Sequence, residues 1–123
     1  MKMIEETIKL APFFKGKIWR KQIELVQNKF SDESLNAVAF KSDGMQQLYI
    51  FDSFVYLNEI VGAFSNNEKT IPINNISSIE FRSKGLYADI IITTSGASIK
   101  VENVHIAIAQ TVTRIIENSK LGK

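Results

Sequence analysis

The sequence carries few of the side chains that perform catalysis. Cysteine is absent, so thiolate metal sites, disulfides and cysteine nucleophiles are all excluded. The one histidine, His105, has no second histidine with which to hold a metal, and a general base normally needs an orienting partner. Neither a Gly-rich phosphate loop nor a Gly-x-Ser-x-Gly elbow is present. We therefore predict a protein that is not an enzyme, with no metal, cofactor or small-molecule substrate; catalysis by His105 with a nearby carboxylate is the weaker alternative.

Aromatic side chains are the second group that could serve a function. They recur between residues 49 and 87 as Tyr49, Phe51, Phe54, Tyr56, Phe64 and Tyr87. Alternation along a strand places Tyr49 and Phe51 on the face opposite to Leu48 and Ile50. If the latter pair is core, the aromatic face either binds a partner or is covered by an N-terminal helix. Both readings stay open, and the candidate partner-binding residues are Trp19, Phe30, Tyr49, Phe51 and Tyr56.

A basic run borders Trp19 and consists of Lys15, Lys17, Arg20 and Lys21. Three readings compete for it. The bases face solvent while the helix docks on its own domain, or the helix binds a protein partner or another copy, or the bases contact anionic lipid. The formal net charge of the whole chain is only +2, so we predict no nucleic-acid binding.

The elements that position these residues fall into two regions. In the first, residues 1–34, Pro12 interrupts any helix begun at Ile4, and apolar residues then recur at helical spacing from Trp19 to Phe30. We predict a helix from Gly16 to Phe30 and an N-terminal helical extension that ends near Ser34. The second region, residues 35–123, alternates as strands do and ends in helical spacing.

Seven strands are expected in the second region, separated by turn signals. Asp43-Gly44 and Asp52-Ser53 divide the first three strands, and residues 61–68 are expected to form a polar loop. A strand ending at Pro72 follows, then a corner at Asn74-Asn75. Three further strands are separated by turns at residues 83–85 and 95–96. We expect Asn103 to cap a closing helix over 104–120, with His105 in its first turn.

Residues 35–119 resemble the bacterial pleckstrin-homology-like domains. The matching features are the hairpin Gln-Gln-Leu-Tyr-Ile-Phe-Asp-Ser-Phe-Val-Tyr-Leu, the segment Lys69–Phe81 with its Ile-Pro-Ile and Ile-Ser-Ser-Ile core, the strand Ile90–Thr93 and the terminal helix. The resemblance implies a mainly β, β-rich α+β fold. Its seven-stranded, strongly bent sheet forms a partly open barrel capped by a C-terminal α-helix, here over 35–123 and preceded by the helical extension 1–34.

The resemblance also implies a function. Bacterial members of the family are often intracellular and prone to self-association, so we expect a cytoplasmic, non-catalytic binding or assembly module acting through protein contacts, as a homo-oligomer or with another protein. Eukaryotic relatives bind phosphoinositides through basic residues after the first strand, where this chain has one base, Lys41, and one acid, Asp43. The alternative function is peripheral attachment to anionic membrane lipid through the basic helix. The chain has neither a secretory signal pattern nor about 18 consecutive apolar residues.

Overall fold

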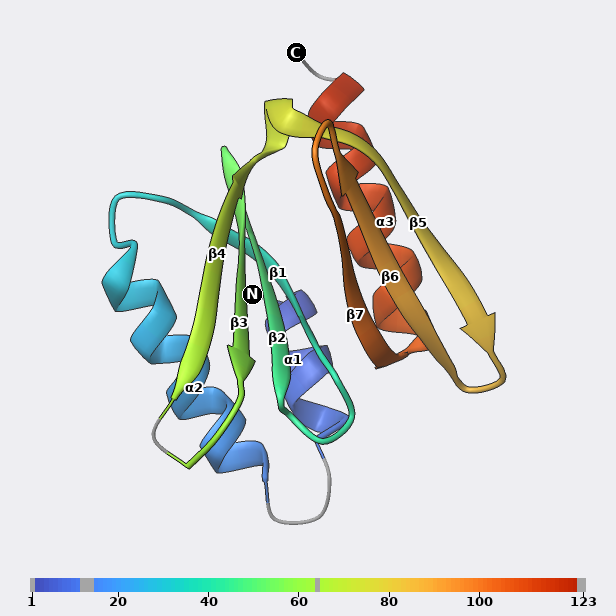
Figure 1. The fold of residues 1–123 in the computed structure, drawn as a ribbon. Coiled ribbons are helices and arrows are strands. Elements are labelled where there is room, and N and C mark those ends of the chain that lie inside the picture. Colours follow the sequence, from blue (N-terminus) through green and yellow to red (C-terminus); the bar gives the residue numbers. More distant parts are fainter. Residues whose placement is uncertain (1, 12–14, 64, 122–123) are drawn as a thin grey trace.

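The computed structural model describes residues 2–11, 15–63 and 65–121. Two helices, seven strands and a third helix follow one another in this part of the chain (Figure 1). The helices are α1 (Lys2–Lys9), α2 (Gly16–Lys29) and α3 (Ile106–Leu121). The strands are β1 (Leu35–Phe40), β2 (Gln46–Phe51), β3 (Phe54–Ile60), β4 (Asn66–Pro72), β5 (Ile76–Lys84), β6 (Tyr87–Thr94) and β7 (Ser98–His105).

The strands form two antiparallel sheets rather than a closed barrel. Sheet A has the order β1-β2-β3-β4, and sheet B has the order β5-β6-β7. A short 3-10 turn, η1 (Ile73–Asn75), carries the chain from one sheet to the other at the upper end of Figure 1. The seven strands and the closing C-terminal helix confirm the fold class expected from the sequence.

The main core lies between the inner faces of the two sheets and α3. Alternate residues of each strand supply it, for example Leu48 and Ile50 from β2, and Ile90 and Ile92 from β6. Helix α3 has its buried side chains at the spacing of one helical face, namely Ile108, Ala109, Val112, Thr113 and Ile116. The helix therefore closes the core as the sequence pattern predicts.

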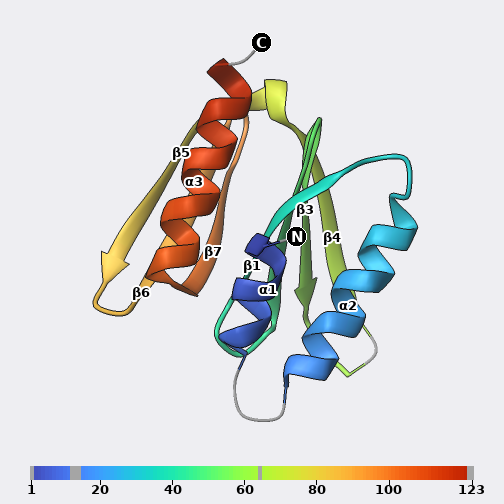
Figure 2. The same ribbon diagram turned by 180° about the vertical axis from the view of Figure 1, so that it is seen from behind.

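A second core lies on the opposite, outer face of sheet A. Helices α1 and α2 cover this face (Figure 2), and α2 points Trp19, Ile23 and Val26 into it. The predicted helix Gly16–Phe30 is confirmed, with Phe30 as its C-cap residue. Pro12 lies outside the described residues.

The start of the last helix was predicted wrongly. Asn103 does not cap it, because β7 continues to His105 and α3 begins at Ile106. Asn103 has φ 51°, a left-handed conformation that asparagine tolerates, and the pairing of β7 with β6 shifts by a bulge there. A polar residue before a helical pattern thus marked a bulge instead of a cap.

The expected polar loop over residues 61–68 is also shorter than predicted. β4 already begins at Asn66, which pairs with Ile60, and its residues up to Thr70 are exposed. An edge strand with both faces near solvent has polar side chains throughout, so its sequence looks like a loop. Phe64 lies outside the described residues.

Candidate functional site

The aromatic hairpin face is buried inside the chain. Tyr49 and Phe51 are 0% exposed, and Tyr56 and Trp19 are each 4% exposed. The structure therefore brings together all five residues predicted to bind a partner, in the cluster between sheet A and the helices α1 and α2 of the same chain (Figure 2). Of the two readings left open by the sequence, coverage by the N-terminal helices is what the structure shows.

Ring contacts make this face one continuous cluster. The Trp19 ring lies 4.7 Å from that of Phe40, which packs edge-on against Tyr49. Phe30 stands edge-on to three rings, with centroid distances of 5.0 to 5.3 Å, namely Phe51, Phe54 and Tyr56. Edge-to-face packing adds to the stabilisation that burial gives. The cluster consequently holds α2 at both ends.

Polar groups within this cluster are satisfied internally. The Tyr49 hydroxyl donates to Gln47 Oε1 at 2.8 Å, and Gln47 Nε2 donates to the carbonyl of Gly44 at 3.2 Å. Burial, with Tyr56 nearby, raises the pKa of Tyr49. Tyr49 thus stays a neutral donor and cannot serve as a base at ordinary pH.

The C-terminal end of α2 is fastened to β4 by a charged pair. Lys29 and the Tyr56 hydroxyl both donate to the Glu68 carboxylate. Lys29 and then Tyr56 lower the pKa of Glu68, while burial and then the bond to Glu68 raise the pKa of Tyr56. These shifts arise from a contact between helix and sheet, so they indicate no catalytic pair.

The predicted basic residues divide into one engaged side chain and three free ones. Arg20 donates to both carboxylate oxygens of Glu5, at 2.7 and 2.8 Å, which ties α2 to α1 and lowers the pKa of Glu5. Lys15, Lys17 and Lys21 are exposed and form no ion pair within the described residues. Of the four predicted basic residues, these three could meet an anionic partner without breaking an ion pair between described residues.

His105 lies at the junction of β7 and α3. Its Nδ1 accepts a hydrogen bond from the backbone N–H of Ala107 at 3.2 Å, so the histidine itself caps α3. It lines a cavity of about 220 Å³ with Trp19, Phe40 and Tyr87. No group of three His, Cys, Asp or Glu residues that could hold a metal occurs in the described part of the chain. Sequence reasoning placed His105 in the helix and missed its capping role.

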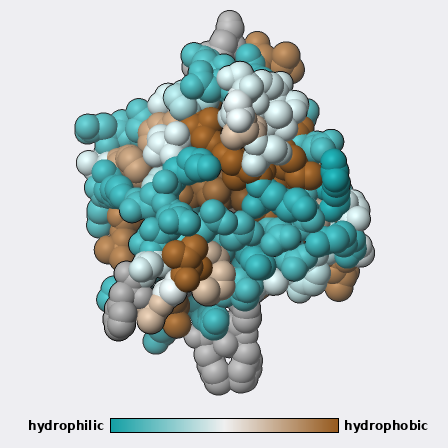
Figure 3. Space-filling model, in the orientation of Figure 1, coloured by the Kyte–Doolittle hydropathy of each residue, from teal (hydrophilic) through white to brown (hydrophobic). Residues whose placement is uncertain are grey.

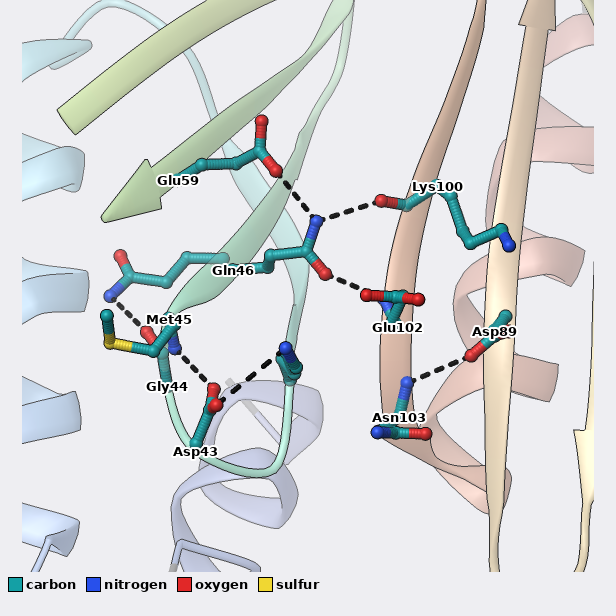
Figure 4. Close-up of polar contacts among 11 residues, drawn as sticks. Asp43, Gly44, Met45, Gln46, Glu59, Asp89, Lys100, Glu102 and Asn103 are labelled. Carbon is teal, nitrogen blue, oxygen red and sulfur yellow. Dashed lines mark hydrogen bonds and ion pairs between the residues drawn. The ribbon is translucent and has the colours of Figure 1, made fainter. Parts of the chain in front are cut away.

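A seam between the two sheets is bridged by the side chain of Gln46 and by the backbone N–H of Ser42, which donates to the carbonyl of Asn103 at 2.9 Å. The amide of Gln46 on β2 donates to Glu59 at 2.8 Å and to the carbonyl of Lys100 on β7 at 2.9 Å (Figure 4). Its oxygen accepts from the backbone N–H of Glu102 at 2.8 Å. Gln46 therefore hydrogen-bonds to β7 as a neighbouring strand would, and no pattern in the sequence predicts this contact.

Each sheet has two edge strands among the described residues, β1 and β4 in sheet A and β5 and β7 in sheet B. Gln46 is hydrogen-bonded to β7, and Thr7 donates to the carbonyl of Val38 in β1, whereas β4 pairs only with β3 and β5 pairs only with β6. β5 is nine residues long, and its outer face carries Ser78, Glu80, Arg82 and Lys84. Glu80 and Arg82 are exposed, and a guanidinium nitrogen of Arg82 lies 3.2 Å from Oε1 of Glu80. An unpaired edge presents backbone N–H and C=O groups to any strand that approaches.

Comparison with known proteins supports the fold and nothing finer. No family model matches the chain, and no curated protein matches it. Among solved structures, the chain is similar to a pleckstrin homology domain from Shewanella amazonensis SB2B, with 12% identity, a TM-score of 0.60, and 89% of this chain and 90% of that one covered. It is also similar to a DUF1696 family protein with a pleckstrin-homology domain from Shewanella loihica PV-4, with 10% identity, a TM-score of 0.57, and coverage of 81% and 95%.

These likenesses establish a pleckstrin-homology-like fold, as the sequence resemblance implied. Both covered shares exceed the range 35–123, so part of residues 1–34 also aligns. None of the helices in the described ranges is both long and apolar enough to cross a membrane.

Proposed function

We propose that this pleckstrin-homology-like module is a non-catalytic binding protein that acts through protein contacts, and that a second copy of the chain is one partner. The free edge of β5 is the observation that carries the proposal. Main-chain hydrogen bonds along such an edge supply affinity, and the side chains beside them set the register.

The residues of β5 are complementary to a second β5 in antiparallel register. With Phe81 on the two-fold axis, Glu80 of each copy lies opposite Arg82 of the other. Opposite charges directly across an antiparallel pair are stabilising, and like charges are destabilising. On the inner face, Ile79 meets Ser83 and the half-buried Phe81 meets its copy.

The buried aromatic residues have an indirect part in this proposal. Trp19, Phe30, Tyr49, Phe51 and Tyr56 hold the N-terminal helices on sheet A, and so leave sheet B as the uncovered one. A partner could contact these residues directly only if α1 and α2 detached from sheet A.

Charge reversal at β5 tests the proposal. We expect Glu80→Arg to weaken self-association by about 1–2 kcal/mol, roughly five- to thirtyfold in Kd, because two attractive pairs become repulsive. The double variant Glu80→Arg with Arg82→Glu restores both pairs in the exchanged sense and should recover the parent affinity. Sedimentation equilibrium over a range of concentrations measures all three proteins.

The same measurements can also contradict the proposal. A parent protein that stays monomeric at high micromolar concentration removes the self-association proposal. If Glu80→Arg self-associates as strongly as the parent protein, the interface lies elsewhere than at the edge of β5. Both residues are exposed, so the fold of each variant should match the parent by circular dichroism.

A further inference from the structure

A cavity of about 220 Å³ lies where the N-terminal helices meet the junction of β7 and α3. Side chains from all three helices and from β1, β6 and β7 line it, and Figure 2 shows α1 between α2 and α3 at this place. The rim includes Leu10 and Tyr87, which are 42% and 41% exposed. The inner wall consists of side chains that are at most 4% exposed, namely Thr7, Trp19, Phe40, Val104 and Ile108. The cavity is therefore an interior space with a mouth.

The enclosed shape distinguishes this cavity from apolar groups on the outer surface. On the face drawn in Figure 3, brown apolar areas are separated by teal hydrophilic ones. Folded proteins normally expose apolar atoms in this way, and such areas specify no ligand. A concave, mostly apolar cavity with a few polar groups is the usual form of a small-molecule site. The chemistry of the lining then determines which molecule fits.

Aromatic rings from both sheets and from α2 line the cavity. The Trp19 ring of α2 lies 4.7 Å from the Phe40 ring of β1, measured between centroids. On sheet B, the rings of Tyr87 and His105 are edge-on with centroids 6.3 Å apart. A flat aromatic molecule packs on such rings in stacked or edge-to-face arrangements, which add to the gain from burial. The rings therefore favour a planar aromatic molecule over a flexible aliphatic one.

The polar groups of the lining include hydrogen-bond donors that are free. Because Nδ1 of His105 accepts from the N–H of Ala107, the proton of the neutral imidazole lies on Nε2, which donates to no described residue. The Ser42 hydroxyl also has no partner in the described part of the chain. Neither aspartate, glutamate, lysine nor arginine is among the described residues that line the cavity. A charged molecule would lose its hydration here without a partner, whereas a neutral one with an acceptor would pair with a donor.

We infer that this cavity binds a small, uncharged aromatic molecule of one or two fused rings that carries a hydrogen-bond acceptor. An apolar cavity of about 150 Å³ holds benzene, so 220 Å³ admits a somewhat larger ring system. No sequence motif predicts this ligand, because the lining is assembled from distant segments. No described residue of β5 lines the cavity, so the inference stands or falls separately from the proposed self-association.

Quinoline is a suitable probe, because it is planar, carries one nitrogen acceptor and is mostly uncharged at neutral pH. Trp19 is the only tryptophan of the chain and His105 the only histidine, so each gives a single set of side-chain NMR resonances. With the full chain, we expect quinoline to shift the indole N–H resonance of Trp19 and the ring resonances of His105, with a Kd of about 10–100 μM. Naphthalene lacks the acceptor and should bind about three- to tenfold more weakly. N-methylquinolinium is charged and should leave both sets of resonances unchanged.

A matched pair of variants locates the site. Ser42→Leu places a larger side chain at a residue that lines the cavity, while the backbone N–H can still donate to the carbonyl of Asn103. Ser95→Leu makes the same change at an exposed residue in the β6–β7 turn, at the other end of sheet B. We expect Ser42→Leu to weaken quinoline binding by about tenfold or more, because it fills part of the space, and Ser95→Leu to leave it unchanged.

Four results would overturn the inference. Resonances of Trp19 and His105 that do not move at about 1 mM quinoline mean that the cavity is no binding site. Equal shifts at amides of β5 indicate nonspecific adsorption, and N-methylquinolinium bound as tightly as quinoline contradicts an uncharged ligand. Parent-like binding by a folded Ser42→Leu places the site elsewhere. The first three comparisons use the parent protein, so they decide the question even if thermal unfolding shows that Ser42→Leu does not fold.

Discussion

The two sheets of this protein have outer faces of opposite character. Sheet A presents Tyr49, Phe51 and Tyr56 outward, and α1 and α2 bury them. Sheet B presents alternating charges outward, including Glu80 and Lys100, which flank Ile91, and no helix in the described part of the chain covers that face. Strands β1, β2 and β3 of sheet A are thus covered on both faces, whereas sheet B is covered on one.

The difference is written in the strand sequences. All six residues of β2 are buried, and it reads as a nearly continuous run of large side chains. β7 alternates buried Ile99 and Val101 with exposed Lys100 and Glu102. Continuous burial is typical of a strand with cover on both sides, and alternation is typical of one solvated face. A strand that is apolar on both faces therefore predicts a second layer, here the N-terminal helices.

Removing a ring from the covered face should have the largest effect. Trp19→Ala deletes a 4%-exposed side chain that packs on Phe40, so we expect a loss of about 3–5 kcal/mol in the free energy of unfolding. Lys100→Ala on the open face should change it by less than about 0.5 kcal/mol. Urea unfolding measures both variants. If Trp19 instead contacts a second copy, its replacement should weaken association more than stability.

The sequence predicted the elements better than their ends or their partners. Turn residues and alternation located all seven strands, because Asp43-Gly44 and Ser95-Gly96 are strong local signals. The start of the last helix was predicted wrongly from Asn103, because one polar residue can favour either a helix cap or a β-bulge. The pairing of β7 with β6 determines which of the two forms.

The candidate site was predicted only in part, because the sequence reveals local geometry and not the contacts between distant segments. Residues of one strand face, such as Tyr49 and Phe51, share a side by local geometry, so their grouping follows from sequence. The contacts of Gln46, in contrast, depend on how distant segments of the chain meet. The contact of Gln46 with Lys100 spans 54 residues, and no periodicity encodes it.

Two glycines, one against the covered face of sheet A and one at an open turn of sheet B, should differ in how well they tolerate a side chain. Gly44 and Gly85 have nearly the same φ, 80° and 77°. A Cβ on Gly44 would lie 3.0 Å from Trp19 Nε1, whereas one on Gly85 would meet nothing within 4 Å. We expect Gly85→Ala to cost about 1 kcal/mol from backbone strain, and Gly44→Ala about 2–3 kcal/mol because the buried indole must also shift. If urea unfolding gives equal losses of stability for the two variants, the Trp19 indole can shift without cost.

Removing the side chain that bridges the two sheets should cost somewhat less stability than Gly44→Ala. Gln46→Ala leaves the carbonyl of Lys100 and the N–H of Glu102 without their partner, so we expect a loss of about 1–2 kcal/mol. Hydrogen exchange of the Glu102 amide should rise more than that of amides in the centre of either sheet. Asn75→Ala, at an exposed residue of η1, is the control and should leave this exchange unchanged. Unaltered exchange in Gln46→Ala would mean that the sheets stay together without this side chain.

The smallest expected effect is a pH dependence on the outer face of sheet B. Burial raises the pKa of Asp89, but hydrogen bonds from Lys84 at 3.0 Å and from the backbone N–H of Asn103 at 3.1 Å outweigh it, so the pKa lies below its usual value. A lowered folded pKa stabilises the protein above the unfolded pKa of about 4, and this contribution is lost as the pH falls through the folded value. Asp89→Asn should therefore cost about 1 kcal/mol at pH 7, and the difference from the parent should shrink steadily in acid. Urea unfolding across that range measures it, with Glu80→Gln at the exposed pair as a control that shows little change. A difference that persists undiminished in acid would assign the effect to the hydrogen bond with Asn103 and leave the charge of Asp89 without a role.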